Sequence, residues 1–312
     1  MKILLGNFAG AFSNVLKFLT WCLVKKDEDA LFFFYANKAD NDHPKLIPFQ
    51  WKHEDVRQNI FEDRHRNIFY KLFEPPAGYT PGDIVNCDTF EMHFPFNIEK
   101  GNYEKYQLKA PPDVFVPYIE HSIFTEKLYN DANFDYFRTT YNTLWKQYLI
   151  PTPYLQDCIQ KDLVAIQAVK AQGKRIVAAF IRSPVHFYSD TNDKSYQFRD
   201  ILQEVEALLQ EYDYVLPITQ VKPYYEYLEQ AFPGKIIPLS RPRHGEMVDW
   251  VALKYTEDEF LNEVRTAIVD VYLASQCDMI IGGLSNLFTS TLFLNPTVPF
   301  KVFECLKGKI SY

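Results

Sequence analysis

A short glycine turn near the C-terminus holds residues whose types and spacing suit phosphate binding. The turn, Gly282-Gly283-Leu284-Ser285-Asn286, follows an apolar stretch at 277–281 and precedes a second apolar segment, 287–294. The pattern predicts a buried strand, a tight turn and a helix, a place where backbone N–H groups and the helix dipole point at one spot. Ser285 and Asn286 would add side-chain donors beside Gly282 and Gly283. An ordinary strand-to-helix turn without a ligand fits the same spacing.

Polar side chains also follow two other predicted strands. Arg182 comes directly after the apolar stretch 175–181, and its guanidinium could hold a diphosphate with two parallel hydrogen bonds. A structural arginine at the sheet edge is the alternative. His186 could donate to a phosphate or act as a base. Thr219, after the predicted strand 213–218, could bind a ribose or phosphate oxygen, although hydroxyls are common at strand ends.

A basic loop follows the next predicted strand, at 235–239. Arg241, Arg243 and His244 lie close together there in an otherwise acidic chain. They could raise the local electrostatic potential around an anionic ligand, and Arg241 is the residue of this loop that we expect to contact it. A solvated basic loop without a ligand explains the same residues equally well.

A second glycine turn lies at the N-terminus. Residues 6–14 separate a predicted strand, 2–5, from a predicted helix, 15–24. The Gly-x-x-x-Gly spacing of this turn is not the dinucleotide fingerprint, which requires Gly-x-Gly-x-x-Gly. The turn is either a plain connection or a loop that faces a ligand through Asn7, Gly10 and Asn14.

The elements around these turns predict an α/β fold. From Pro153 onward, helices alternate cleanly with short apolar strands, which indicates a parallel sheet with right-handed crossovers. The N-terminal strands 2–5 and 30–35 flank a helix in the same way, whereas repeated prolines break up residues 38–150. Within that region we expect a strand at 83–87 and a helix at 136–149. The segment 150–153 is the expected hinge between a domain at 1–152 and a domain at 153–312.

Composition narrows the functional class. Apolar residues make up 47% of the 312-residue chain, which excludes a disordered protein, and the 21 Tyr and 26 Phe indicate aromatic cores more than a sugar-binding surface. The net charge of −7 argues against a general nucleic-acid binder. Neither a P-loop nor a Gly-x-Ser-x-Gly elbow is present, which argues against nucleoside triphosphatases and α/β-hydrolases.

Cysteine usage and hydropathy predict a cytoplasmic protein. The five cysteines are scattered, with no metal-ligand spacing and no disulfide framework, and this favours a reducing compartment. The apolar stretch 12–24 is too short to span a membrane, and the N-terminus lacks the features of a signal peptide. Peripheral contact with a membrane-bound substrate stays open.

Three stretches resemble the fucosyltransferase-like glycosyltransferases, a family that includes the nodulation-type fucosyltransferases and the protein O-fucosyltransferases. The first is 2–14, similar to the family's opening strand and glycine loop. The second is 177–182, similar to its strand that ends in His-x-Arg-x-x-Asp. The third and most specific is 270–286, similar to its last motif. Thr219 also matches the Thr of a strand-end Thr-Asp pair.

The resemblance implies two Rossmann-like domains that face each other across a cleft, the GT-B type. It also implies a nucleotide-sugar donor, with GDP-fucose favoured, and a glycan or glycolipid acceptor, in an inverting reaction without a metal ion or other cofactor. Arg182 would bind the β-phosphate, while Ser285 and Asn286 would hold the pyrophosphate.

The chain departs from the family pattern at three positions. Phe180 stands in place of the motif's His, Val185 in place of its Asp, and Gln220 in place of the Asp that follows Thr219. His186 is the residue that would take over a polar role. The departures also fit a non-catalytic sugar- or nucleotide-binding relative, and a sugar epimerase is a third hypothesis.

Overall fold

A computed structural model of the chain separates it into two compact units. One unit comprises 1–123, 143–156 and 254–265, and the other comprises 124–142, 157–253 and 266–312. The structure describes residues 2–6, 15–16, 18–19, 22, 31–35, 69–74, 91–93, 132–182, 198–239, 241, 243–244, 257–283 and 285–304.

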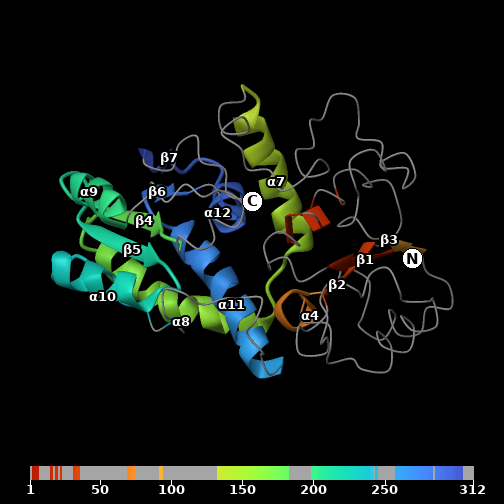
Figure 1. The fold of residues 1–312 in the computed structure, drawn as a ribbon. Coiled ribbons are helices and arrows are strands. Elements are labelled where there is room, and N and C mark those ends of the chain that lie inside the picture. The colour runs from red at the N-terminus through yellow and green to blue at the C-terminus, as the bar shows by residue number, and fades with distance from the viewer. Residues whose placement is uncertain are drawn as a thin grey trace, which may run out of the picture. The chain divides into compact units, whose positions relative to one another are not determined.

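The first unit contains a three-stranded parallel sheet (Figure 1). Its strands are β1 (Lys2–Gly6), β2 (Leu31–Tyr35) and β3 (Glu91–His93), in the order β2-β1-β3. The expected strands at 2–5 and 30–35 are therefore confirmed, whereas the expected strand at 83–87 lies outside the described residues. β3 was not predicted, because its three residues carry no apolar run. The short helix α4 (Phe69–Leu72) belongs to the same unit.

The second unit contains a four-stranded sheet in which every neighbouring pair is parallel. Its strands are β4 (Ile176–Phe180), β5 (Tyr214–Ile218), β6 (Met279–Gly282) and β7 (Phe300–Val302), in the order β5-β4-β6-β7. Both units thus confirm the α/β class with parallel sheets. Their arrangement across a cleft and the boundary at 152 stay predictions.

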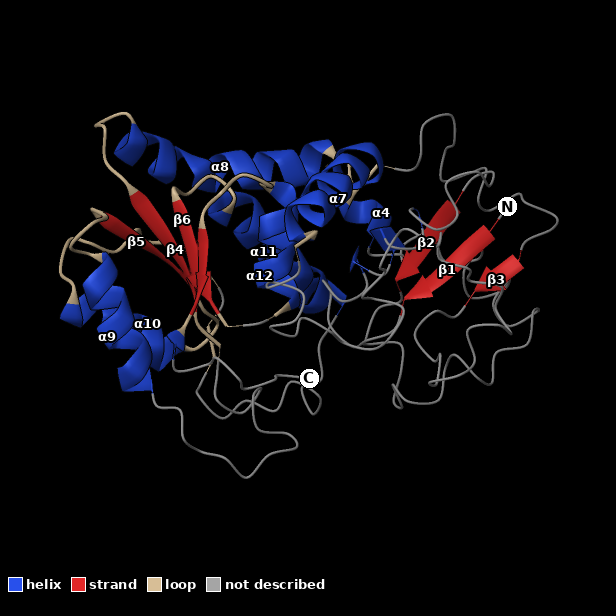
Figure 2. Cartoon of the chain, turned by 90° about the horizontal axis from the view of Figure 1, so that it is seen from above, coloured by secondary structure: helices blue, strands red, loops and turns tan. Residues whose placement is uncertain are grey.

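Helices cover both faces of the four-stranded sheet. α9 (Phe198–Leu208) and α10 (Lys222–Ala231) lie on one face, and α8 (Pro153–Lys170), α11 (Glu257–Ala274) and α12 (Asn286–Leu294) lie on the other (Figure 2). α7 (Phe134–Tyr148) precedes α8. Gly173 and Gly234 follow α8 and α10 with φ of 71° and 72°, a left-handed backbone that glycine adopts without strain and that stops a helix.

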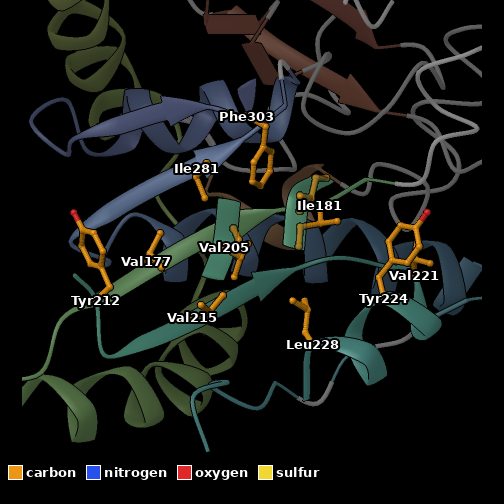
Figure 3. Packing of buried hydrophobic residues seen from close by; sticks show 12 residues of the cluster. Val177, Ile181, Val205, Tyr212, Val215, Val221, Tyr224, Leu228, Ile281 and Phe303 are labelled. Carbon is orange, nitrogen blue, oxygen red and sulfur yellow. The ribbon is translucent and has the colours of Figure 1, made fainter. Parts of the chain in front are cut away.

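The core of this unit follows from the apolar central strands. All five residues of β4 are buried, as expected for a parallel strand with helices on both faces. Val177 and Val215, on the neighbouring strands β4 and β5, contact the apolar sides of α9 and α10 through Val205 and Leu228 (Figure 3). The packing holds β4 rigidly, and with it the residues at its carboxyl end.

The expected strand at 235–239 is only a single bridge. Ile236 pairs with Val215 alone, through backbone hydrogen bonds from Val215 to Lys235 and from Ile237 to Val215. Pro238 has no N–H group to continue a ladder, so the pairing ends there. In the expected hinge at 150–153, the Ile150 carbonyl accepts a hydrogen bond from the Glu74 N–H at 2.7 Å, and the role of this segment as a hinge stays a prediction.

Among the described helices, none combines the length and the apolar character that crossing a bilayer requires.

Candidate functional site

The strand order creates a crevice between the carboxyl ends of β4 and β6. After β4 the chain adds β5 on one side, and it later returns to place β6 on the other side of β4. The connections that leave β4 and β6 therefore run in opposite directions, which opens a crevice at this point, the usual ligand site of parallel sheets. Arg182 follows β4, and the predicted phosphate turn follows β6.

A pocket lies at these strand ends and brings together three predicted site residues, Arg182, Thr219 and Ser285. It encloses about 100 Å³. Whole small-molecule sites measure roughly 300–1,000 Å³, so a cavity of this size would take one part of a ligand, such as a phosphate group. Its lining consists of Phe180, Ile181, Arg182, Ile218, Thr219, Gln220, Val221, Ala267, Asp270, Ser285 and Leu287.

Arg182 is a cation without a carboxylate partner in the described part of the chain. Surrounding protein atoms take hydration away from its guanidinium, and this lowers the pKa of Arg182. The residue as a whole is nevertheless exposed to solvent. Among the described residues, no hydrogen bond or ion pair engages this side chain. A free guanidinium in a recess is well suited to bind an anion such as a diphosphate.

Ser285 is the residue immediately before α12 and forms the N-cap of this helix. The residue has extended backbone angles, and its Oγ accepts a hydrogen bond from the Phe288 N–H at 3.2 Å. This is N-capping, in which a side-chain oxygen satisfies one of the helix's first N–H groups. The N–H groups of Asn286 and Leu287 have no carbonyl within the helix to bond, and they carry the positive end of its dipole. An anion at this end of α12 would be stabilised by both effects.

Gly282 is placed for packing. It pairs with Phe180 on β4, and a Cβ atom added to it would lie 2.8 Å from Phe180 Cβ and 2.8 Å from Phe288 Cδ2. Only glycine therefore lets α12 approach the sheet this closely. Neither Gly282 nor Gly283 lines the pocket within the described part of the chain. Their predicted contact with the donor stays a prediction.

Phe180 stands where the resembling family has His, and the structure gives it an apolar role. Its ring meets that of Phe288 edge to face, with centroids 5.9 Å apart. This side of the pocket therefore has an apolar wall instead of a hydrogen-bond donor.

Thr219 lines the pocket from the end of β5. It is buried, and its Oγ1 accepts a hydrogen bond from the Val221 N–H at 3.2 Å. The oxygen is thus held in place by its own loop, while the hydroxyl hydrogen can still be donated to a ligand.

Arg241 lies between two carboxylates. Its Nε donates to Asp270 Oδ1 at 2.7 Å and its Nη1 donates to Asp162 Oδ2 at 2.7 Å. The side chain is 8% exposed and does not line the described pocket, whereas Asp270 does. Burial raises the pKa of Asp270 to about 6, against the opposite effect of Arg241. Among the described residues, Asp270 is the one that links Arg241 to the pocket.

Sequence reasoning missed Asp270 as a pocket residue. The available signal was a carboxylate between Val269 and Val271, which are both buried on α11. A charged residue within such an apolar run needs a partner when the helix packs. The partner, Arg241, lies 29 residues away, so the sequence alone did not indicate the pair.

The rest of the basic loop is held by local contacts. Arg243 lies over the Tyr225 ring at 3.5 Å and donates from Nη1 and Nη2 to the Leu239 carbonyl, both at 3.1 Å. The His244 backbone bonds to Gln220 at 2.7 Å, beside the end of β5. Four predicted site residues lie outside the described residues: Asn7, Gly10, Asn14 and His186.

Comparison with known proteins found matches among solved structures. No family model and no curated protein sequence matches the chain. The chain is similar to a structure of fucosyltransferase NodZ from Bradyrhizobium, at 10% identity over 98% of this chain and 96% of that one, with a TM-score of 0.49. It is also similar to POFUT1 in complex with GDP, at 12% identity over 97% of this chain and 98% of that one, with a TM-score of 0.37. An Arabidopsis thaliana FUT1 mutant in complex with GDP matches at 12% identity over 96% of this chain and 69% of that one, with a TM-score of 0.43.

Proposed function

We propose that this protein is a glycosyltransferase that moves a sugar from a nucleoside-diphosphate sugar to a glycan or glycolipid acceptor. The observation that carries the proposal is Arg182, which has no partner among the described residues and lines a pocket together with Ser285, the N-cap residue of α12. A cation and a helix N-terminus that meet at one recess suit the stabilisation of a departing diphosphate.

The proposed reaction breaks the bond between the anomeric carbon and the diphosphate oxygen. The electron pair leaves with the diphosphate, so negative charge grows on its oxygens in the transition state. Arg182 and the first turn of α12 stabilise that charge, which lowers the barrier without a metal ion. The acceptor hydroxyl attacks the anomeric carbon from the side opposite the diphosphate, which inverts the configuration, and its proton passes to solvent water.

GDP-fucose is the favoured donor, on the strength of the sequence resemblance in 2–14, 177–182 and 270–286. Arg182 serves the β-phosphate, while Ser285 and Asn286 serve the pyrophosphate. Thr219 donates its hydroxyl hydrogen, and Arg241 supports the site through Asp270. Gly282 and Gly283 shape the turn. The sequence pattern adds Asn7, Gly10 and Asn14 as donor contacts and His186 as a polar group near the reaction.

A substitution series at Arg182 tests the proposal. Arg182→Ala should lower transfer from the sugar nucleotide by roughly a hundredfold or more, the loss expected for a contact to transition-state charge. Arg182→Lys should retain part of the activity, because it keeps the charge but not the paired hydrogen bonds. Arg175→Ala is the matched control, since Arg175 precedes the other end of β4 and lies over the Tyr212 ring at 4.3 Å. Full turnover by Arg182→Ala would overturn the assignment.

A binding panel separates catalysis from binding alone. GDP, UDP, CDP and ADP, each with and without its sugar, are compared by the shift in thermal unfolding. A ligand at a hundred times its dissociation constant should add about 2.7 kcal/mol to the free energy of unfolding. Binding of GDP with no release of GDP from GDP-fucose in the presence of acceptors would favour a non-catalytic relative. No response to any nucleotide would overturn the donor site.

A further inference from the structure

The carbonyl groups at the C-terminal end of α12 accept hydrogen bonds from the side chains of another helix. α12 has nine residues, and the last carbonyls of any α-helix have no N–H partner within the helix. Leu292 and Phe293 are fully buried, so water does not satisfy their carbonyl groups. The required donors come from α7, about 150 residues earlier in the chain.

Arg138 and Asn142 of α7 supply these donors. Arg138 donates from Nη2 to the Val298 carbonyl at 2.7 Å and to the Asn295 carbonyl at 3.1 Å, and from Nε to the Leu292 carbonyl at 3.4 Å. Asn142 Nδ2 donates to the Leu294 carbonyl at 2.7 Å and to the Phe293 carbonyl at 3.0 Å. Two side chains thus serve five carbonyl groups at or just beyond the end of α12.

The contacting residues of α7 form one continuous surface against the end of α12. Arg138 and Asn142 are four residues apart and so lie on the same face of the helix. Tyr141 is next to them and stacks on Phe293 of α12, with ring centroids 4.4 Å apart and planes 20° apart. Both Arg138 and Asn142 are buried, at 5% and 6% exposure. Figure 1 shows α7 next to α12.

We propose that Arg138 and Asn142 are positioning residues for the diphosphate site, acting through α12. This inference rests on the proposed function, because it assigns the first turn of α12 to the diphosphate. A nine-residue helix is about 14 Å long and moves as one rod, so fastening its last turn also fixes its first turn. Displacement of catalytic donors by about 1 Å can lower rates a hundredfold.

The readout that separates positioning from general stability is the preference for GDP over guanosine. Only GDP carries the diphosphate that the start of α12 is proposed to hold. Asn142→Leu keeps the size of the side chain but removes both donations, and it should weaken GDP binding about tenfold while guanosine binding changes little. Arg138→Lys keeps the charge but reaches fewer carbonyls, so it should give a smaller loss and serves as a second variant if Asn142→Leu does not fold.

Control substitutions on the exposed side of α7 complete the design. Gln147→Leu makes a similar amide-to-Leu change, and Lys146→Met removes a cation from the same helix; both should leave the two affinities unchanged. Equal losses of GDP and guanosine affinity in Asn142→Leu and Arg138→Lys, or no loss in either, would overturn the positioning role. Wild-type protein that binds no GDP would instead overturn the proposed function, and the inference with it.

Discussion

At the scale of single residues, Gly282 matters to the site because glycine has no Cβ atom. A Cβ at this position would meet Phe180 on β4 and Phe288 on α12. Gly282→Ala should therefore destabilise the fold by about 1–3 kcal/mol, the usual cost of overpacking. It should also weaken binding at the pocket, because Phe288 belongs to the first turn of α12.

Urea unfolding and GDP titration measure the two effects. Phe288→Leu removes the ring that Gly282→Ala would strike, so the double substitution should cost less free energy than the sum of the single ones. Strict additivity would show that the two positions do not compete for the same space.

Asp270 provides the residue-scale prediction on pH. Burial raises the pKa of this carboxyl from 3.8 to about 6 in the folded protein. Between pH 4 and 6 the folded state therefore keeps a proton that the unfolded chain has released. The free energy of unfolding should fall as pH rises through this range, by up to about 3 kcal/mol, and Asp270 should contribute no slope above it.

Chemical unfolding at several pH values, with wild type and Asp270→Asn, checks this dependence. The asparagine cannot titrate but can still accept the hydrogen bond from Arg241, so the variant should lose this part of the slope. Asp258→Asn is the matched control, since Asp258 is an exposed carboxylate on the same helix. An unchanged slope in Asp270→Asn would contradict the assignment of the proton to Asp270.

At the scale of elements, the start of α12 combines two functions that one substitution can separate. Ser285 caps the helix through Phe288 N–H, and it also lines the pocket. Ser285→Asp should preserve the cap, because Asp is as good an N-cap as Ser, yet its negative charge should repel a diphosphate. Ser285→Ala should lower stability by about 0.5–2 kcal/mol, because the cap is lost.

Thermal unfolding and GDP affinity are measured side by side for both variants, with Ser285→Thr as the control that keeps the hydroxyl. The expected outcome is a crossed pattern, in which Ser285→Asp is stable and binds poorly while Ser285→Ala is less stable and binds better than Ser285→Asp. If Ser285→Asp left the GDP affinity unchanged, the proposal that the diphosphate binds at the start of α12 would be wrong.

At the scale of the whole molecule, the order of the strands sets the kind of chemistry. Placing β6 beside β4 sets the start of α12 at the strand ends that also carry Arg182. Both groups contribute positive potential at one place. The proposed transfer therefore takes its electrostatic stabilisation from the protein itself.

Transfer should accordingly proceed at an unchanged rate after exhaustive treatment with EDTA, and added Mg²⁺ or Mn²⁺ should change the rate less than twofold. The product should carry the inverted anomeric configuration, which NMR of the glycoside determines. A rate that falls to background with EDTA and returns with a divalent ion would contradict the proposed mechanism.

The sequence by itself determined the parallel α/β fold of the second unit and several residues of its pocket. Short apolar runs bounded by glycine, proline and polar residues have one good solution, which is buried parallel strands with helices between them. The polar residues that follow such strands must then lie at their carboxyl ends, as Arg182, Thr219 and Ser285 do.

Only the tertiary structure decided which strands are neighbours and which distant side chains pair. The contacts of Arg241 with Asp162 and Asp270, and those of Arg138 with the end of α12, join residues 29 to 160 positions apart. Such pairs leave no local pattern, because they depend on which distant segments of the chain pack against each other. The structure also decided the packing role of Gly282 between β4 and α12, which the glycine spacing did not indicate, while its contact with the donor stays a prediction.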